Sequence, residues 1–222
     1  MTTVLFKSYP APEINKREII RYMGAKELSF EQEALLDECL SEIMQKLSYK
    51  VCWRKTNVSV KEETVDLGFA SFNSKGLCMN LEGCEEAIVF AATVGLDMDR
   101  AIAKYSRLSP VKGLIMQAIG AERIESLCDT FNAETGTWAQ ENEKCLRPRF
   151  SPGYGDFSIE AQKEIFKTLD CVRKIGLTLN DSLLMSPSKS VTAIIGISGC
   201  PKKFHKEKCA ACGKADCTFR TL

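Results

Sequence analysis

The chain has 222 residues, with 30 Lys and Arg against 29 Asp and Glu, and 45% of its residues are hydrophobic. This length corresponds to one large domain or two small ones, and the composition is that of an ordinary globular protein. The balanced charge argues against a nucleic-acid-binding domain, which needs an excess of Lys and Arg to neutralise phosphates. No apolar run approaches the roughly 18–20 residues that span a bilayer, and the start of the chain lacks a signal-peptide pattern. We therefore expect a cytoplasmic protein with no membrane or nucleic-acid partner.

Apolar periodicity predicts two helices near the start of the chain. Residues 15–23 are typical of a short helix that stops near Gly24. Residues 29–47 carry apolar side chains at helical spacing, and Ser29 followed by Gln32 has the pattern of a capping box. We expect this second helix to be amphipathic.

Four stretches are typical of strands. Residues 51–68 are rich in Val and Thr, and residues 177–179 predict a short strand or turn. Residues 87–94 and 191–197 are short, continuous apolar runs. Such runs are expected of strands that are buried on both faces of a sheet.

The middle of the chain predicts long helices. Residues 98–105 and 111 to about 131 have helical character on either side of Pro110. Residues 133–143 are polar and predict a loop. We therefore expect two packed helices that are followed by an irregular connection.

Prolines and glycines punctuate residues 146–157, which excludes a regular helix there. Residues 158–169 resume helical periodicity, with Ser158 as the expected N-cap. Helices and strands are mixed without a regular βαβ repeat, so the sequence predicts an α+β domain with a buried, mainly antiparallel sheet and packed helices. We expect this domain to span residues 1–199, before a cysteine-rich, basic appendix at 200–222.

The eleven cysteines divide into two groups. Four near the end have the spacing Cys200-x8-Cys209-x2-Cys212-x4-Cys217, which suits a tetrathiolate site for zinc or an iron–sulfur cluster. A metal-free tail is the alternative. The others are dispersed, and we expect them to be reduced and to serve as small core residues. The dispersed cysteines are Cys39, Cys52, Cys78, Cys84, Cys128, Cys145 and Cys171.

The sequence lacks the usual catalytic motifs. His205 is the only histidine, which weakens the case for a Ser-His-Asp or Cys-His arrangement. There is also no GxGxxG after a strand, no GxxxxGK[ST] and no HExxH. Many common reaction classes therefore lose support.

Residues 149–156 (RFSPGYGD) combine groups that suit a small ligand. Arg149 can bind a carboxylate through two parallel hydrogen bonds. Gly153 allows a ligand to approach the backbone, and Tyr154 offers a flat ring with a polar tip. Such a set suits a zwitterion that carries a flat heterocycle, although it also occurs in purely structural turns.

These residues resemble the Arg-x-x-x-Gly-Tyr motif that binds S-adenosylmethionine in the activation domain of cobalamin-dependent methionine synthase. A second block of that family, Leu-Thr-Glu-Ser-x-x-Met-x-Pro-x-x-Ser-Val, is similar to residues 177–191. The later part of this block matches at Met185, Pro187, Ser190 and Val191. Two blocks in the same order and at nearly the same separation are more specific than either alone.

The resemblance implies S-adenosylmethionine as the ligand. By that resemblance Arg149 would bind the methionine carboxylate, and Glu125 would pair with the ammonium group. The backbone of Gly153 and Tyr154 would support the adenosyl part. Glu122, one helical turn before Glu125, is the alternative acid.

The resemblance also implies the partners. They are corrinoid-bearing methionine synthase modules, which carry the cobalamin, and an electron donor protein. One electron would reduce inactive cob(II)alamin on the partner, and the methyl group of S-adenosylmethionine would pass to the cobalt.

The chain departs from the family pattern after Tyr154. Residues 155–163 keep only Lys163 in register, and Glu160 stands where the family has a histidine. We expect a stand-alone module, and two alternatives stay open. One is an iron–sulfur redox activator of a corrinoid methyltransferase that uses the four terminal cysteines. The other is a non-catalytic partner of a corrinoid protein, with zinc fixing the tail.

Overall fold

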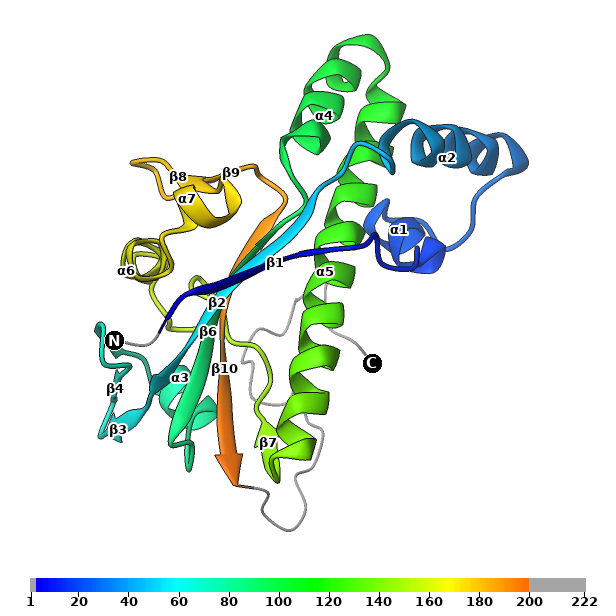
Figure 1. Cartoon of the computed structure of the whole chain (residues 1–222). Helices are drawn as coiled ribbons and strands as arrows, with labels where there is room; N and C mark the ends of the chain where they lie inside the picture. The colour runs from blue at the N-terminus through cyan, green and yellow to red at the C-terminus, as the bar shows by residue number, and fades with distance from the viewer. Residues whose placement is uncertain (1–2, 200–222) are drawn as a thin grey trace.

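The computed structural model describes residues 3–199 (Figure 1). In this part of the chain, the main element is a five-stranded sheet in the order β1-β2-β6-β10-β7, and every neighbouring pair is antiparallel. Its strands are β1 (Leu5–Tyr9), β2 (Tyr49–Asn57), β6 (Glu86–Thr93), β10 (Ser190–Gly199) and β7 (Lys144–Leu146). The predicted α+β class with a mainly antiparallel sheet is confirmed. Two smaller antiparallel sheets consist of β3 (Ser59–Lys61), β4 (Thr64–Asp66) and β5 (Ser71–Asn73), and of β8 (Thr178–Leu179) and β9 (Met185–Ser186).

Helices cover both faces of the large sheet (Figure 1). One face carries α1 (Lys16–Tyr22), α2 (Phe30–Ile43), α4 (Leu96–Leu108) and α5 (Pro110–Glu141). The other carries α3 (Lys75–Asn80), α6 (Ala161–Leu169) and α7 (Cys171–Ile175). Each face therefore has its own hydrophobic core.

The central strand β6 explains why its sequence is apolar without interruption. Phe90 packs into the core beneath α5, whereas Val89 packs into the core beneath α6. In β10, Ile195 and Ile194 divide between the same two cores. Because successive side chains of a strand point to opposite faces, a strand covered on both sides needs apolar residues at every position.

The first two helices begin where the sequence predicts. The side chain of Asn15 accepts a hydrogen bond from the backbone of Glu18 and caps α1. At the start of α2, Ser29 and Gln32 form both hydrogen bonds of a capping box. These caps satisfy backbone N–H groups that have no partner inside the helix.

The predicted loop at residues 133–143 is wrong, because α5 continues to Glu141. Phe131, Thr135 and Ala139 are buried at intervals of four residues, which places them on one face of the helix. Trp138 packs against the same core. The polar residues between them face outward, so the composition resembled a loop although the periodicity was helical.

The N-cap predicted at Ser158 is also wrong, because α6 begins at Ala161 and its N-cap is Glu160. The Ser158 hydroxyl instead accepts a hydrogen bond from the backbone N–H of Glu160, two residues on. Serine makes such local turns as readily as helix caps. The helix therefore starts two residues later than predicted.

Six of the seven dispersed cysteines are free and buried, as predicted. Cys145 is the exception, because it is partly buried in β7 and disulfide-bonded. The free cysteines are Cys39, Cys52, Cys78, Cys84, Cys128 and Cys171.

Across residues 3–199, none of the helices combines the length and the apolar character that a membrane crossing requires.

Candidate functional site

The segment that carries Arg149 is held to the sheet and to α3. Phe150 and Ile194 of β10 exchange two backbone hydrogen bonds of 2.9 Å. At the other end of the segment, Phe157 is buried in the core beneath α6. Asp156 accepts hydrogen bonds at 2.7 Å from the Ser74 hydroxyl and at 2.6 Å from the backbone N–H of Lys75. The residues between these anchors form a largely exposed turn.

Arg149 reaches α5 and contacts two carboxylates there. Its Nη2 donates to Oε2 of Glu125 at 3.1 Å and to Oδ1 of Asp129 at 3.0 Å. The Arg149 side chain is 22% exposed, and its Nη1 is buried without a hydrogen-bond partner. The structure therefore places Arg149 next to Glu125, two of the residues singled out in the sequence, and Nη1 of Arg149 has no hydrogen-bond acceptor in the part of the chain that the structure describes.

Burial and charge act on this cluster in opposite directions. Burial lowers the pKa of Arg149, but the neighbouring Cys128, Glu125 and Asp129 outweigh it, so the net pKa is raised. Burial also raises the pKa of Cys128 to about 12, against a smaller lowering effect from Arg149. At neutral pH the site consequently contains a charged guanidinium beside a neutral thiol.

Glu122, the alternative acid, lies in a different network. It is 2% exposed and accepts hydrogen bonds from Nε of Arg123 at 2.5 Å and from the Ser126 hydroxyl at 2.7 Å. The backbone N–H of Asn15 donates to it at 3.0 Å. Glu122 therefore holds the segment before α1, whereas Glu125 faces Arg149.

Gly153 and Tyr154 lie in the exposed turn. Gly153 has φ +91°, which only glycine adopts readily, and its N–H donates to the carbonyl of Phe157 at 2.8 Å. The Tyr154 side chain is exposed. In the part of the chain that the structure covers, no hydrogen bond or ion pair connects either residue to Arg149.

Sequence reasoning missed Asp129 as a member of this cluster. It lies four residues after Glu125, so both side chains project from the same face of α5. That spacing, together with the helical periodicity of this stretch, is the signal by which it could have been found.

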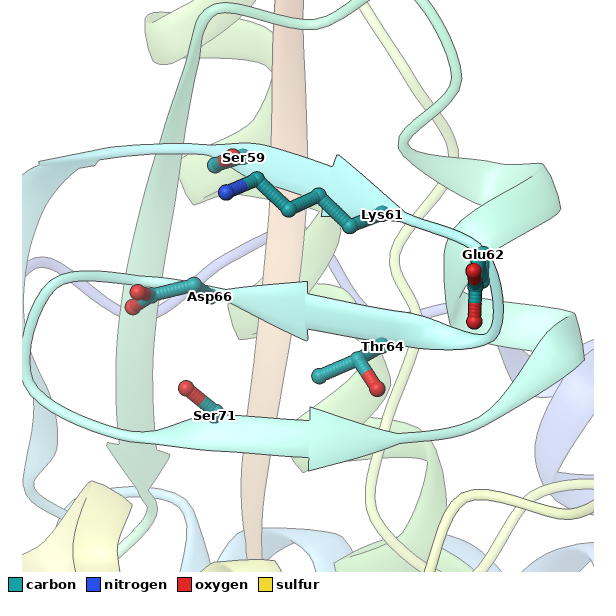
Figure 2. Close-up of a pocket in the computed structure, with 6 residues that line it drawn as sticks. All are labelled: Ser59, Lys61, Glu62, Thr64, Asp66 and Ser71. Carbon is teal, nitrogen blue, oxygen red and sulfur yellow. The ribbon is translucent and has the colours of Figure 1, made fainter.

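Two hollows lie elsewhere on the surface and contain none of the predicted site residues. The first, of about 450 Å³, is an open polar face of the β3–β4–β5 sheet, shown in Figure 2. It is lined by Ser59, Lys61, Glu62, Thr64, Asp66 and Ser71. The second, of about 460 Å³, lies on α6, α7 and β8. The Arg149 cluster is the stronger candidate, because it combines a partly buried guanidinium with two carboxylates on a segment that resembles a ligand-binding motif.

The predicted metal ligands Cys200, Cys209, Cys212 and Cys217 lie outside the described residues. Between residues 3 and 199 no group of three or more His, Cys, Asp or Glu side chains is placed to hold a metal ion.

No protein-family model and no curated protein matches the chain. A solved structure of the MetH reactivation domain bound to AdoHcy (S-adenosylhomocysteine) matches with a TM-score of 0.62. The match covers 91% of this chain and 80% of the other, at 13% sequence identity. The chain therefore shares the α+β fold of that reactivation domain, in agreement with the resemblance of its two sequence blocks.

Proposed function

We propose that this protein binds S-adenosylmethionine and supports the reductive methylation of cob(II)alamin on a separate methionine synthase. The observation that carries the proposal is the pairing of Arg149 with Glu125 on a fold shared with a domain whose solved structure holds AdoHcy. The cobalamin belongs to the partner, and an electron donor protein supplies the electron.

The Arg149 cluster fits the amino-acid part of this ligand. The buried Nη1 of Arg149 lacks an acceptor, which a ligand carboxylate would supply through a charge-assisted hydrogen bond. Glu125 is 45% exposed and can accept a hydrogen bond from the ligand ammonium group without leaving α5. A zwitterion would in this way complete both halves of the ion pair.

In this proposal the protein contributes orientation. The methyl donor supplies the chemistry, and the protein holds the sulfonium methyl in line with the acceptor on the partner. The double anchoring of residues 150–157 to β10 and α3 supports such a role, because it fixes the turn that contains Gly153 and Tyr154. The backbone of that turn would contact the adenosyl part.

The test is calorimetric titration of the full chain with S-adenosylmethionine, comparing the wild type with Arg149→Ala. Loss of a charge-assisted contact should cost about 1.5–3 kcal/mol, roughly tenfold or more in affinity. Arg107→Ala is the matched control, because it removes the same charge from an exposed position on α4. Equal affinities for all three proteins would contradict the assignment of Arg149.

The second part of the proposal concerns the partner. Bound S-adenosylmethionine should yield S-adenosylhomocysteine when cob(II)alamin-loaded methionine synthase modules and a one-electron reductant are added. The absorbance change of the corrinoid and the appearance of S-adenosylhomocysteine report this step independently. Binding without turnover would limit the function to ligand binding.

Zinc or an iron–sulfur cluster in residues 200–222 stays a prediction, and with it the redox-activator alternative.

A further inference from the structure

We infer that Asp129 is a specificity-determining residue, which makes the Arg149 site prefer the cationic sulfonium of S-adenosylmethionine over the neutral thioether of S-adenosylhomocysteine. This inference rests on the proposed function, because it concerns the same ligand at the same guanidinium. It adds a residue that the sequence did not indicate and a basis for discriminating the methyl donor from its product.

The geometry places two carboxylates on one guanidinium nitrogen. Oδ1 of Asp129 lies 3.0 Å from Nη2 of Arg149, and Oε2 of Glu125 lies 3.1 Å from the same nitrogen. Two acids four residues apart repel each other on a helix. Arg149 offsets this repulsion, but its single positive charge cannot neutralise both.

The cluster therefore has a surplus of one negative charge. Along residues 3–199, neither Glu125 nor Asp129 forms an ion pair with any cation other than Arg149. The nearby Glu122 does not add to the surplus, because Arg123 pairs with it. Cys128 does not add to it either, since burial keeps its thiol protonated at neutral pH.

Asp129 is the group in this cluster that can respond to a ligand most easily. Its side chain is 72% exposed, compared with 45% for Glu125 and 22% for Arg149. A ligand carboxylate that binds Nη1 of Arg149 would share the guanidinium with both acids, which accept from Nη2. The more exposed Asp129 can then turn toward the positive part of the ligand without disturbing the core.

S-adenosylmethionine and S-adenosylhomocysteine differ in net charge, to which a surplus of negative charge in the site responds. Both carry the same amino-acid and adenosine groups, but the sulfonium adds one positive charge that the thioether lacks. A site with one excess negative charge attracts the sulfonium form more strongly, and this attraction weakens as salt screens it. Removing the charge of Asp129 should reduce the preference while leaving the shared contacts in place.

The experiment measures the dissociation constants of S-adenosylmethionine and S-adenosylhomocysteine for the full chain at low and high salt. In Asp129→Asn the preference for S-adenosylmethionine, expressed as the ratio of the two constants, should fall about three- to tenfold, and its dependence on salt should weaken. Asp129→Glu keeps the charge and should keep the wild-type ratio. Glu141→Gln is the matched control, because it removes the same charge from an exposed position near the end of α5.

The outcomes separate this inference from the proposed function. If the wild type binds S-adenosylmethionine and Asp129→Asn leaves the ratio unchanged, the inference is wrong and the proposed function stands. An equal loss of both affinities also overturns the inference, because it shows that Asp129 only positions Arg149. If the wild type binds neither nucleoside, both are overturned. Thermal unfolding of each variant checks that the fold is retained.

Discussion

Two clusters each join an arginine to carboxylates of α5, and they differ in how many of the arginine's nitrogens have hydrogen-bond partners. Arg123 is fully buried, and its nitrogens donate to both oxygens of Glu122 and to the carbonyls of Pro12 and Glu13. Arg149 is partly exposed, shares Nη2 between two carboxylates and leaves Nη1 without a partner. The Arg123 cluster joins α5 to the segment before α1, whereas Nη1 of Arg149 has no hydrogen-bond acceptor.

This difference separates a structural network from a candidate site. Buried polar groups are almost always satisfied in a folded protein, so a complete network needs nothing from outside. A network with an unsatisfied buried donor either lowers the stability of the fold or gains its missing acceptor from a ligand. Two acids on the same helix, Glu122 and Glu125, thus have opposite roles because of their partners and not because of their sequence context.

The largest expected effect tests the structural cluster. Arg123→Ala leaves Glu122 buried without its cation and should reduce the free energy of unfolding by about 3–5 kcal/mol. Arg149→Ala should cost no more than about 1 kcal/mol, because its carboxylate partners are exposed to solvent. Urea denaturation measures both.

A double variant keeps the comparison testable if Arg123→Ala does not fold. Glu122→Gln combined with Arg123→Met leaves no unpaired charge and should recover part of the lost stability. Equal losses for Arg123→Ala and Arg149→Ala would remove the distinction between the two clusters.

A smaller effect tests whether Asp156 anchors the segment of residues 149–157 to the start of α3. Asp156→Asn should cost about 1 kcal/mol at pH 7, because the carboxylate accepts hydrogen bonds at the start of α3 but is largely exposed. The Ser74 hydroxyl, followed by the backbone N–H groups of Gly76 and Lys75, lowers the pKa of Asp156 below its usual value.

The sign of the pH dependence follows from that lowered pKa. The stabilisation is present above the pKa of the unfolded state, near 4, and is lost as the pH falls through the lower folded value. The stability difference between wild type and Asp156→Asn should therefore be constant from about pH 7 to 5 and shrink below about pH 4. A difference that grows toward low pH would contradict this anchoring role.

The smallest expected effect tests α5, which carries the carboxylates of both clusters. Gly136 lies in the segment that the sequence predicted as a loop, and a Cβ built there meets nothing within 4 Å. Gly136→Ala should increase the free energy of unfolding by about 0.5–1 kcal/mol, because alanine favours the helix over the unfolded chain. Thermal or urea unfolding measures this, and no gain would show that the helix ends earlier.

Local pattern determined much of the fold. The capping box at Ser29 and the apolar runs at 87–94 and 191–197 predicted a helix and two interior strands that the structure contains. Caps and apolar runs act between residues that are close in the chain, so their signal is complete in the sequence. The pattern of Arg149, Gly153 and Tyr154 singled out a segment in the sequence, and the function of these residues stays a prediction.

Tertiary structure alone decided how α5 is used. Residues 133–141 continue the helix with Phe131, Thr135 and Ala139 buried on one face, and Phe131 packs against Phe90 of the sheet; the polar neighbours concealed this pattern. The choice of Glu125 over Glu122, and the addition of Asp129, depends on which side of α5 faces the Arg149 segment. That relation joins residues 20 or more positions apart, and it is set by the packing of β10, the Arg149 segment and α5 and not by any local pattern.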